Sequence, residues 1–354
     1  MTPGPGGDAG IALPVWHHRH LLDVDRLTWP EIETLMDVAS RFEAATADPG
    51  RKLDVLRGVN VTILFYEAST RTRVSFEIAA KKLGADVVSV TAAGSSVTKG
   101  ESLIDTVRTL EATGTRILVM RHATSGAPYL VPAIFGGNVI NGGDGWHAHP
   151  TQALVDLYTL RQALPRPKGS KNSWSLRGRK VAIVGDLLHS RVARSNLWTL
   201  TAAGADVWVC APGPLLRGFE VWAAAGAGGR RFTATTDVDA ALRDADVVMT
   251  LRIQKERMAA GLLPSLGEYA ARFGITRERL RGASPQVLVM HPGPMNEGVE
   301  IAPDVADGPG SLITTQVRNG VAIRMAVLAM LHSAGPGPMS AARAPGSAAG
   351  GDPA

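Results

Sequence analysis

The stretch Phe65–Val88 reads FYEASTRTRVSFEIAAKKLGADVV, and it decides the fold of the chain. It begins at the end of an apolar run, NVTILF at 60–65, which is typical of a buried strand. Apolar residues then recur at helical spacing over 76–83, and a glycine stops that helix. Another apolar run follows at 86–91. The stretch therefore predicts a strand–helix–strand unit, the building block of a parallel sheet.

Strand and helix patterns alternate in this way along two parts of the chain. The first series follows a helix expected at 28–45 and ends with a helix at 149–164. The second series starts with the apolar run at 180–186 and ends with a strand at 286–294. Short glycine-marked turns between such elements favour helix-covered parallel sheets. We therefore predict an α/β fold with two Rossmann-like domains, each a parallel, helix-covered sheet.

Composition suggests where these domains begin and end. The two ends, 1–15 and 335–354, are rich in Gly, Ala, Pro and Ser, so we expect both to be disordered. The first domain is predicted at 16–160 and the second at 161–315. A strongly apolar helix predicted at 316–334 follows the second domain, and we expect it to return and pack on the first.

Composition also excludes several classes of protein. With 45% hydrophobic and 19% charged residues, the chain has the balance of a soluble globular enzyme. No run approaches the roughly 18 apolar residues of a membrane span, and the start lacks a signal-peptide pattern. The single cysteine, Cys210, fits a reducing cytoplasm. Lys and Arg are scattered despite a net charge of +5, which favours anionic small molecules over nucleic acid as partners.

Two hydroxyls and two guanidiniums occupy the turn between the first strand and its helix. The set is Ser69-Thr70-Arg71-Thr72-Arg73, at the carboxyl edge of the predicted sheet. The first N–H groups of a helix have no intrahelical partners, and the helix dipole favours an anion there. Helix capping alone would explain one hydroxyl, not the whole set. These residues therefore predict a phosphate site.

Polar side chains at two later positions favour the same edge. Arg121 ends a buried strand, and His149 and Gln152 lie three apart at a helix start, so they face one way. A His-x-His pair, with His147, could suggest a metal, but no carboxylate or cysteine ligands accompany it, so we expect no metal. A histidine that polarises a carbonyl, either neutral or protonated, fits better. We expect His147 to be a surface residue.

The polar loop at 92–106 has two interpretations from its residues alone. Ser95 and Lys99 could reach an anion, and the flanking glycines permit movement. A surface loop with a solvated lysine would have the same composition.

Three places in the second series are also polar. The turn after the strand at 180–186 has only Gly185 and lacks a G-x-G-x-x-G motif, so we expect no dinucleotide cofactor; Arg191 instead suggests anion binding. Arg252 and Gln254 follow another strand, ahead of a helix start at 255–257 that we expect to be solvated. The Pro/Gly loop at 291–294 either exposes backbone carbonyls to an amide NH₂ group or is simply a tight turn.

The motifs, taken in order, resemble the aspartate carbamoyltransferase catalytic chain of the aspartate/ornithine carbamoyltransferase superfamily. The resemblance covers about residues 16–333, and it implies an active site in the cleft between the two domains. Single motifs are modest, but seven in the same order are highly specific. They are Ser-Thr-Arg-Thr-Arg, Lys-Gly-Glu, Met-Arg-His, His-Pro-Thr-Gln, Gly-Asp-x₄-Ser-Arg, Arg-x-Gln-x-Glu-Arg and His-Pro-Gly-Pro.

The resemblance implies a metal-free and cofactor-free transfer of a carbamoyl group from carbamoyl phosphate to L-aspartate, in pyrimidine biosynthesis. It implies a carbamoyl phosphate site made by Ser69, Thr70, Arg71, Thr72, Ser95, Arg121, His149, Gln152, Gly293 and Pro294. It implies an aspartate site made by Lys99, Arg191, Arg252 and Gln254. The implied catalytic residues are Arg71, Thr72, Lys99, Arg121 and His149.

The resemblance also implies a homotrimer in which Ser95 and Lys99 reach into the site of a neighbouring subunit, and the single cysteine leads us to expect it in the cytoplasm. It leaves open whether regulatory or dihydroorotase chains join a larger assembly. Two alternatives remain. One is the same fold with another amino acceptor, ornithine or another amine; ornithine carbamoyltransferase has a His-Cys-Leu-Pro segment where this chain has His-Pro-Gly-Pro. The other is a non-catalytic partner chain with a decayed site. Glu297 stands where many relatives have arginine, which affects local ion pairing.

Overall fold

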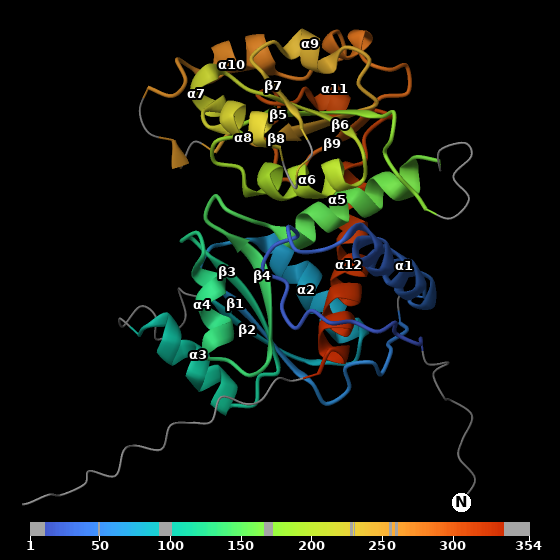
Figure 1. The fold of residues 1–354 in the computed structure, drawn as a ribbon, viewed down its shortest axis with the longest axis vertical. Coiled ribbons are helices and arrows are strands. Elements are labelled where there is room, and N and C mark those ends of the chain that lie inside the picture. The colour runs from blue at the N-terminus through green and yellow to red at the C-terminus, as the bar shows by residue number, and fades with distance from the viewer. Residues whose placement is uncertain are drawn as a thin grey trace, which may run out of the picture.

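The computed structural model describes residues 11–48, 50–91, 101–165, 173–226, 229, 231–254, 257–258 and 261–335. Its described strands form two separate parallel sheets, one in each of two stacked lobes (Figure 1). The predicted α/β fold of two parallel, helix-covered sheets is confirmed. The loop that carries Ser95 and Lys99 lies outside the described residues, as does most of both predicted tails.

The sheet of the first lobe has the strand order β2-β1-β3-β4. Its central strands β1 and β3 are apolar and nearly continuously buried, as expected for a parallel sheet covered on both faces. The register pairs Val61 with Val87 on one side and with Ile117 on the other. The strands are β1 (Asn60–Phe65), β2 (Asp86–Thr91), β3 (Ile117–His122) and β4 (Asn138–Asp144).

The sheet of the second lobe has the order β7-β6-β5-β8-β9, again all parallel. The strand predicted at 286–294 is wrong in length, because only Leu288–Met290 pairs before two prolines, which lack an N–H donor. The strands are β5 (Lys180–Gly185), β6 (Asp206–Cys210), β7 (Thr233–Thr235), β8 (Val247–Leu251) and β9 (Leu288–Met290).

Helices surround both sheets, and their starts follow local sequence rules. The Thr28 and Glu31 side chains form a capping box at α1, and Ser69, Ser102 and Ser190 cap three later helices. The described helices are α1 (Trp29–Ala45), α2 (Thr70–Lys82), α3 (Leu103–Ala112), α4 (Ala127–Leu130), α5 (Pro150–Ala163), α6 (Arg191–Ala202), α7 (Gly213–Leu216), α8 (Phe219–Ala225), α9 (Val238–Leu242), α10 (Leu266–Phe273), α11 (Pro303–Ala306) and α12 (Ile313–Ser333), with 3₁₀ turns at Val131–Ala133 and Arg279–Gly282.

The last helix, α12, lies in the first lobe although it follows the second in sequence (Figure 1). It packs against α1, α2 and α5. The side-chain amide of Asn138 donates to the carbonyl of Leu331 at 2.9 Å and ties α12 to β4. Helix α5 contacts α6 of the second lobe, so the two lobes meet along α5 and α6. No helix in the described part of the chain has the length and apolar character needed to cross a bilayer.

We expect Ile323→Ala to lower the free energy of unfolding by about 2–5 kcal/mol, because it leaves a cavity where α12 packs on the first lobe. Ile323 is fully buried. The measurement is chemical denaturation followed by circular dichroism. Arg318→Ala, an exposed change on the same helix, serves as the control and should alter stability by no more than about 0.5 kcal/mol. Equal losses for the two variants would contradict the packing role of α12.

Candidate active site

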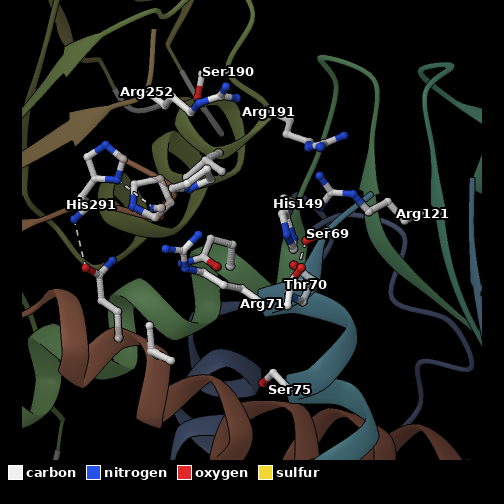
Figure 2. Close-up of a pocket in the computed structure, with 18 of the residues that line it drawn as sticks. Ser69, Thr70, Arg71, Ser75, Arg121, His149, Ser190, Arg191, Arg252 and His291 are labelled. Atoms are coloured by element: carbon white, nitrogen blue, oxygen red, sulfur yellow. Dashed lines mark hydrogen bonds between the residues drawn. The ribbon is translucent and has the colours of Figure 1, made fainter. Parts of the chain in front are cut away.

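A cavity of about 510 Å³ opens between the lobes, at the carboxyl ends of strands from both sheets. Figure 2 shows Ser69, Thr70 and Arg71 on one side of this space and Ser190 and Arg252 on the other. Every predicted site residue that the structure describes lines the cavity: Ser69, Thr70, Arg71, Thr72, Arg121, His149, Gln152, Arg191, Arg252, Gln254, Gly293 and Pro294. The sequence did not single out four further polar residues of the lining: Glu67, Ser75, Gln316 and Arg324.

The start of α2 both caps the helix and faces the cavity. The Ser69 hydroxyl accepts from the backbone N–H of Thr72 at 3.4 Å, so this side chain is a cap. Thr70 and Arg71 follow in the first turn and line the cavity. Arg73 does not line it and pairs with Glu77 at 3.2 Å. Ser69 therefore both caps the helix and lines the cavity, whereas Thr70 and Arg71 line it without capping.

The loop after β9 crosses to the first lobe and lies on Arg71. Gly293 has φ +66°, and a Cβ atom there would lie 2.8 Å from Cζ of Arg71. Only glycine therefore combines this backbone with this close approach. The backbone N–H of Gly293 donates to Nδ1 of His291 at 2.8 Å, so Nδ1 is unprotonated. The other ring nitrogen then carries the proton and donates to Glu300 at 3.3 Å.

His149 is a neutral imidazole in the wall of the cavity. Burial lowers its pKa well below the usual value, and the nearby Arg121 and Arg191 lower it further. Its backbone N–H donates to Oγ of Ser195 at 3.0 Å, and that hydroxyl donates to Asp23 at 3.1 Å. Nδ1 has no partner within the described chain. Of the two protonation states considered from the sequence, the structure favours the neutral one.

Glu67 joins both lobes through ion pairs with three arginines. It lies two residues after the end of β1 and contacts Arg191 at 2.9 Å, Arg257 at 2.6 Å and Arg121 at 3.3 Å. Burial raises the pKa of Glu67, but the three guanidiniums prevail and lower it to about 2. The expectation that Arg257 is solvated is wrong, because it also donates to the carbonyl of Gly145 at 3.0 Å.

The cluster places Arg121 and Arg191 together at one wall of the cavity (Figure 2). Two nitrogens of Arg191 donate to the Glu67 carboxylate, so in this structure its contacts are with the protein itself. Burial lowers the pKa of Arg121 to about 9. The neighbouring Arg191 lowers this pKa further, whereas the Glu67 carboxylate raises it. Arg121 therefore remains charged at neutral pH.

Arg324 extends this positive character to the floor of the cavity. It is buried on α12, donates to the Ser75 hydroxyl at 2.8 Å and lies over the ring of Phe76. Burial lowers its pKa to about 10. The only sequence signal was a charge within an otherwise apolar helix, and the sequence alone did not show which way it faced. Among the described residues, no group of His, Cys, Asp and Glu side chains has a metal-binding arrangement.

Two family models match consecutive parts of the chain. Residues 19–162 match the aspartate/ornithine carbamoyltransferase carbamoyl-P binding domain, and residues 177–331 match the Asp/Orn binding domain of the same family. The chain belongs to the aspartate/ornithine carbamoyltransferase family. In this member the helix that ends the second match, α12, packs in the first lobe.

Among curated relatives, the aspartate carbamoyltransferase catalytic subunit of Roseiflexus sp. (strain RS-1) is 56% identical over 310 residues, 88% of this chain and 94% of the relative. That of Chloroflexus aurantiacus is 51% identical and covers 88% of this chain and 97% of the relative.

Two solved structures have the same fold. The aspartate transcarbamoylase of Trypanosoma cruzi, in complex with carbamoyl phosphate and aspartate, is 31% identical with a TM-score of 0.75, over 90% of this chain and 99% of that one. The catalytic subunit of M. Jannaschii aspartate transcarbamoylase is 34% identical with a TM-score of 0.71, over 89% and 98%.

We expect Glu67→Gln to destabilise this carbamoyltransferase by about 2 kcal/mol at pH 7.5, because a neutral amide leaves three clustered guanidiniums unbalanced. The loss should be smaller than for a fully buried pair, since the Glu67 side chain is 24% exposed. The folded pKa lies below that of an unfolded glutamate, so the stabilisation is present above pH about 4.5 and declines as pH falls toward 2.

Urea denaturation of the wild type and the variant at pH 7.5, 5 and 4 measures this difference. Glu268→Gln, which breaks only the exposed pair with Arg272, is the matched control and should cost at most about 0.5 kcal/mol. Equal stability of Glu67→Gln and wild type at pH 7.5 would show that the cluster does not hold the lobes together.

Proposed function

We propose that the protein is an aspartate carbamoyltransferase. It transfers the carbamoyl group of carbamoyl phosphate to the amino group of L-aspartate, giving N-carbamoyl-L-aspartate and phosphate in pyrimidine biosynthesis. The observation that carries this proposal is the cavity itself. It brings the first turn of α2, a neutral histidine and arginines of both lobes around one space suited to two anionic reactants.

The phosphate of carbamoyl phosphate binds at the start of α2, where Ser69, Thr70, Arg71 and Thr72 line the cavity. Unpaired N–H groups of the first turn and the Arg71 guanidinium supply charge-assisted hydrogen bonds. Ser95 and Lys99 of a neighbouring subunit complete this part of the site. Arg71 and Lys99 also offset charge on the phosphate as it leaves.

The carbamoyl group lies between His149, Arg121 and Gln152, beside the Gly293–Pro294 backbone. The aspartate amino group attacks the carbamoyl carbon, the bond from that carbon to the phosphate oxygen breaks, and the proton lost from nitrogen passes to the phosphate. His149 and Arg121, with Thr72, stabilise the oxyanion that develops on the carbonyl. Much of the rate comes from holding two mutually repelling anions together.

Aspartate binds from the second lobe, where Arg252 and Gln254 follow β8 and Arg191 begins α6. The two arginines bind its carboxylates, and Lys99 assists from the neighbouring subunit. Gln254 donates to the carbonyl of His189 at 3.1 Å, which leaves its side-chain carbonyl to accept from the substrate. Two nitrogens of Arg191 already donate to Glu67. Aspartate therefore binds to the N–H groups of this guanidinium that do not donate to Glu67.

The domain roles, location and assembly follow the same proposal. Residues 16–160 with the helix at 316–334 form the carbamoyl phosphate unit, and 161–315 form the aspartate unit. The matched family models support this division, although the second of them extends through α12. The single cysteine supports a place in the cytoplasm. The protein acts as a homotrimer, because the family resemblance places Lys99 at a neighbour's site and a cyclic head-to-tail interface allows that.

We expect Arg252→Ala to raise the KM for aspartate by at least about 100-fold while carbamoyl phosphate binding stays near wild type, because a substrate carboxylate loses its charged partner. A colorimetric assay of the ureido product measures turnover, and calorimetry measures carbamoyl phosphate binding. Arg272→Ala, an exposed arginine of the same lobe, is the control. Faster turnover of ornithine than of aspartate by the wild type would overturn the choice of acceptor.

Mixed trimers of Lys99→Ala and His149→Ala chains, each inactive alone, should recover roughly a quarter of wild-type activity. A site is intact only when its own His149 and the neighbour's Lys99 are both present, and each condition holds with probability one half in a randomly reassorted head-to-tail ring. Native mass spectrometry verifies reassortment. If verified hybrids stay as inactive as their parents, Lys99 does not serve a neighbouring site.

A further inference from the structure

A buried carboxylate lies one helical turn beyond Gln152 and binds three side-chain amides. Asp156, on α5, is fully buried. Its Oδ1 accepts from Nε2 of Gln152 at 2.8 Å and from Nε2 of Gln316 at 2.8 Å. Its Oδ2 accepts from Nδ2 of Asn196 at 2.8 Å. The three amides come from α5, α12 and α6, so this carboxylate links helices of both lobes.

The carboxylate decides which way the Gln152 amide faces. An ionised carboxylate can only accept hydrogen bonds, so the NH₂ group of Gln152 must point toward Asp156. The carbonyl oxygen of the same amide must then point the other way. Gln152 lines the cavity, and its carbonyl accepts no hydrogen bond among the described residues. Gln152 therefore presents an acceptor, and not a donor, to a bound ligand.

Gln316 is oriented by the same atom. Its NH₂ group donates to Asp156, and its carbonyl accepts from the backbone N–H of His291 at 3.0 Å. His291 in turn holds the loop that reaches Arg71, so the position of that loop depends on the orientation of Gln316. Asp156 thus aligns two parts of the cavity wall: the Gln152 amide and the loop after β9.

Asp156 is ionised at the mildly alkaline pH of an assay. Burial raises its pKa to about 6, while Asn196, Gln316, Gln152 and the more distant Arg324 oppose that rise. At pH 8 the group is therefore a carboxylate and a strict acceptor.

We propose that Asp156 is a positioning residue that makes the cavity specific for a carbamoyl group, by holding the Gln152 carbonyl toward the NH₂ group of the substrate. This inference rests on the proposed function. A carbamoyl group differs from an acetyl group by NH₂ in place of CH₃, and only the NH₂ group can donate to Gln152. Discrimination between two otherwise similar acyl phosphates is therefore the property that Asp156 controls.

The test compares the affinities of carbamoyl phosphate and acetyl phosphate at pH 8 without aspartate, by calorimetry on the intact protein. We expect the wild type to favour carbamoyl phosphate. Asp156→Leu, similar in size but without an acceptor, should reduce that preference by about 10-fold, the value of one hydrogen bond, because the Gln152 amide can then turn. Gln152→Met should reduce it by the same factor, and the double variant should lose no more than either single variant.

Two variants separate positioning from general support of the fold. Asn196→Leu removes the donor to the other carboxylate oxygen and should keep the preference at the wild-type value. Asp156→Asn should keep it too. In that variant the side-chain carbonyl of the introduced amide can take the place of Oδ1, and Asn196 can turn its unpartnered carbonyl toward the new NH₂ group. A structural role alone would weaken binding of both ligands equally in every Asp156 variant.

The outcomes distinguish this inference from the proposed function. Failure of the wild type to bind carbamoyl phosphate would overturn the proposed function. Wild-type binding with an unchanged preference in Asp156→Leu, or in Gln152→Met, would overturn the positioning role alone. If Asp156→Leu does not fold, the comparison uses Asp156→Leu with Asn196→Leu, which removes one stranded donor. Gln152→Met remains decisive in either case. If the preference for carbamoyl phosphate is unchanged in that variant, the Gln152 amide does not contribute to it, and Asp156 cannot act by orienting that amide.

Discussion

The ion pairs of Glu67 with Arg121, Arg191 and Arg257 are the constraint on which the site depends. Glu67 follows a strand of the first sheet, whereas Arg191 and Arg257 belong to the second lobe. One carboxylate balances three guanidiniums, so net positive charge remains at the wall that the lobes share. That excess attracts anionic reactants. The same contact that joins the lobes therefore also prepares the cavity for its ligands.

Burial gives the polar groups around this cavity different tasks. His149 is kept neutral, so it can donate one hydrogen bond to a carbonyl without adding positive charge. Arg121 and Arg324 are also buried, yet both remain charged at neutral pH. Asp156 is buried among amides that only donate to it. A buried polar group without a partner is costly, so the three amides that donate to Asp156 restrict its orientation.

The two parallel sheets were predictable because alternating strands and helices leave a strong periodic signal. Short elements left none: β7 and α11 have 3 and 4 residues, too few for a period to show. Most of the cavity wall was also predictable, since polar side chains at the ends of buried parallel strands gather at one edge. Glu67 follows such a strand as well, but a single glutamate beside an arginine-rich turn is typical of a solvated side chain. Its partners lie 54 to 190 residues away in the sequence, so no local pattern indicates them.

By itself, the sequence determined the two parallel sheets, the capped and arginine-bearing start of α2, and the order of the motifs. These depend on local periodicity and capping, which act over a few residues. Only the tertiary structure decided that Arg257 pairs with Glu67, that Arg324 faces the cavity and that Asp156 orients Gln152. The direction of a buried side chain is set by partners distant in sequence, because an unpaired polar group must find a donor or acceptor wherever the fold brings one.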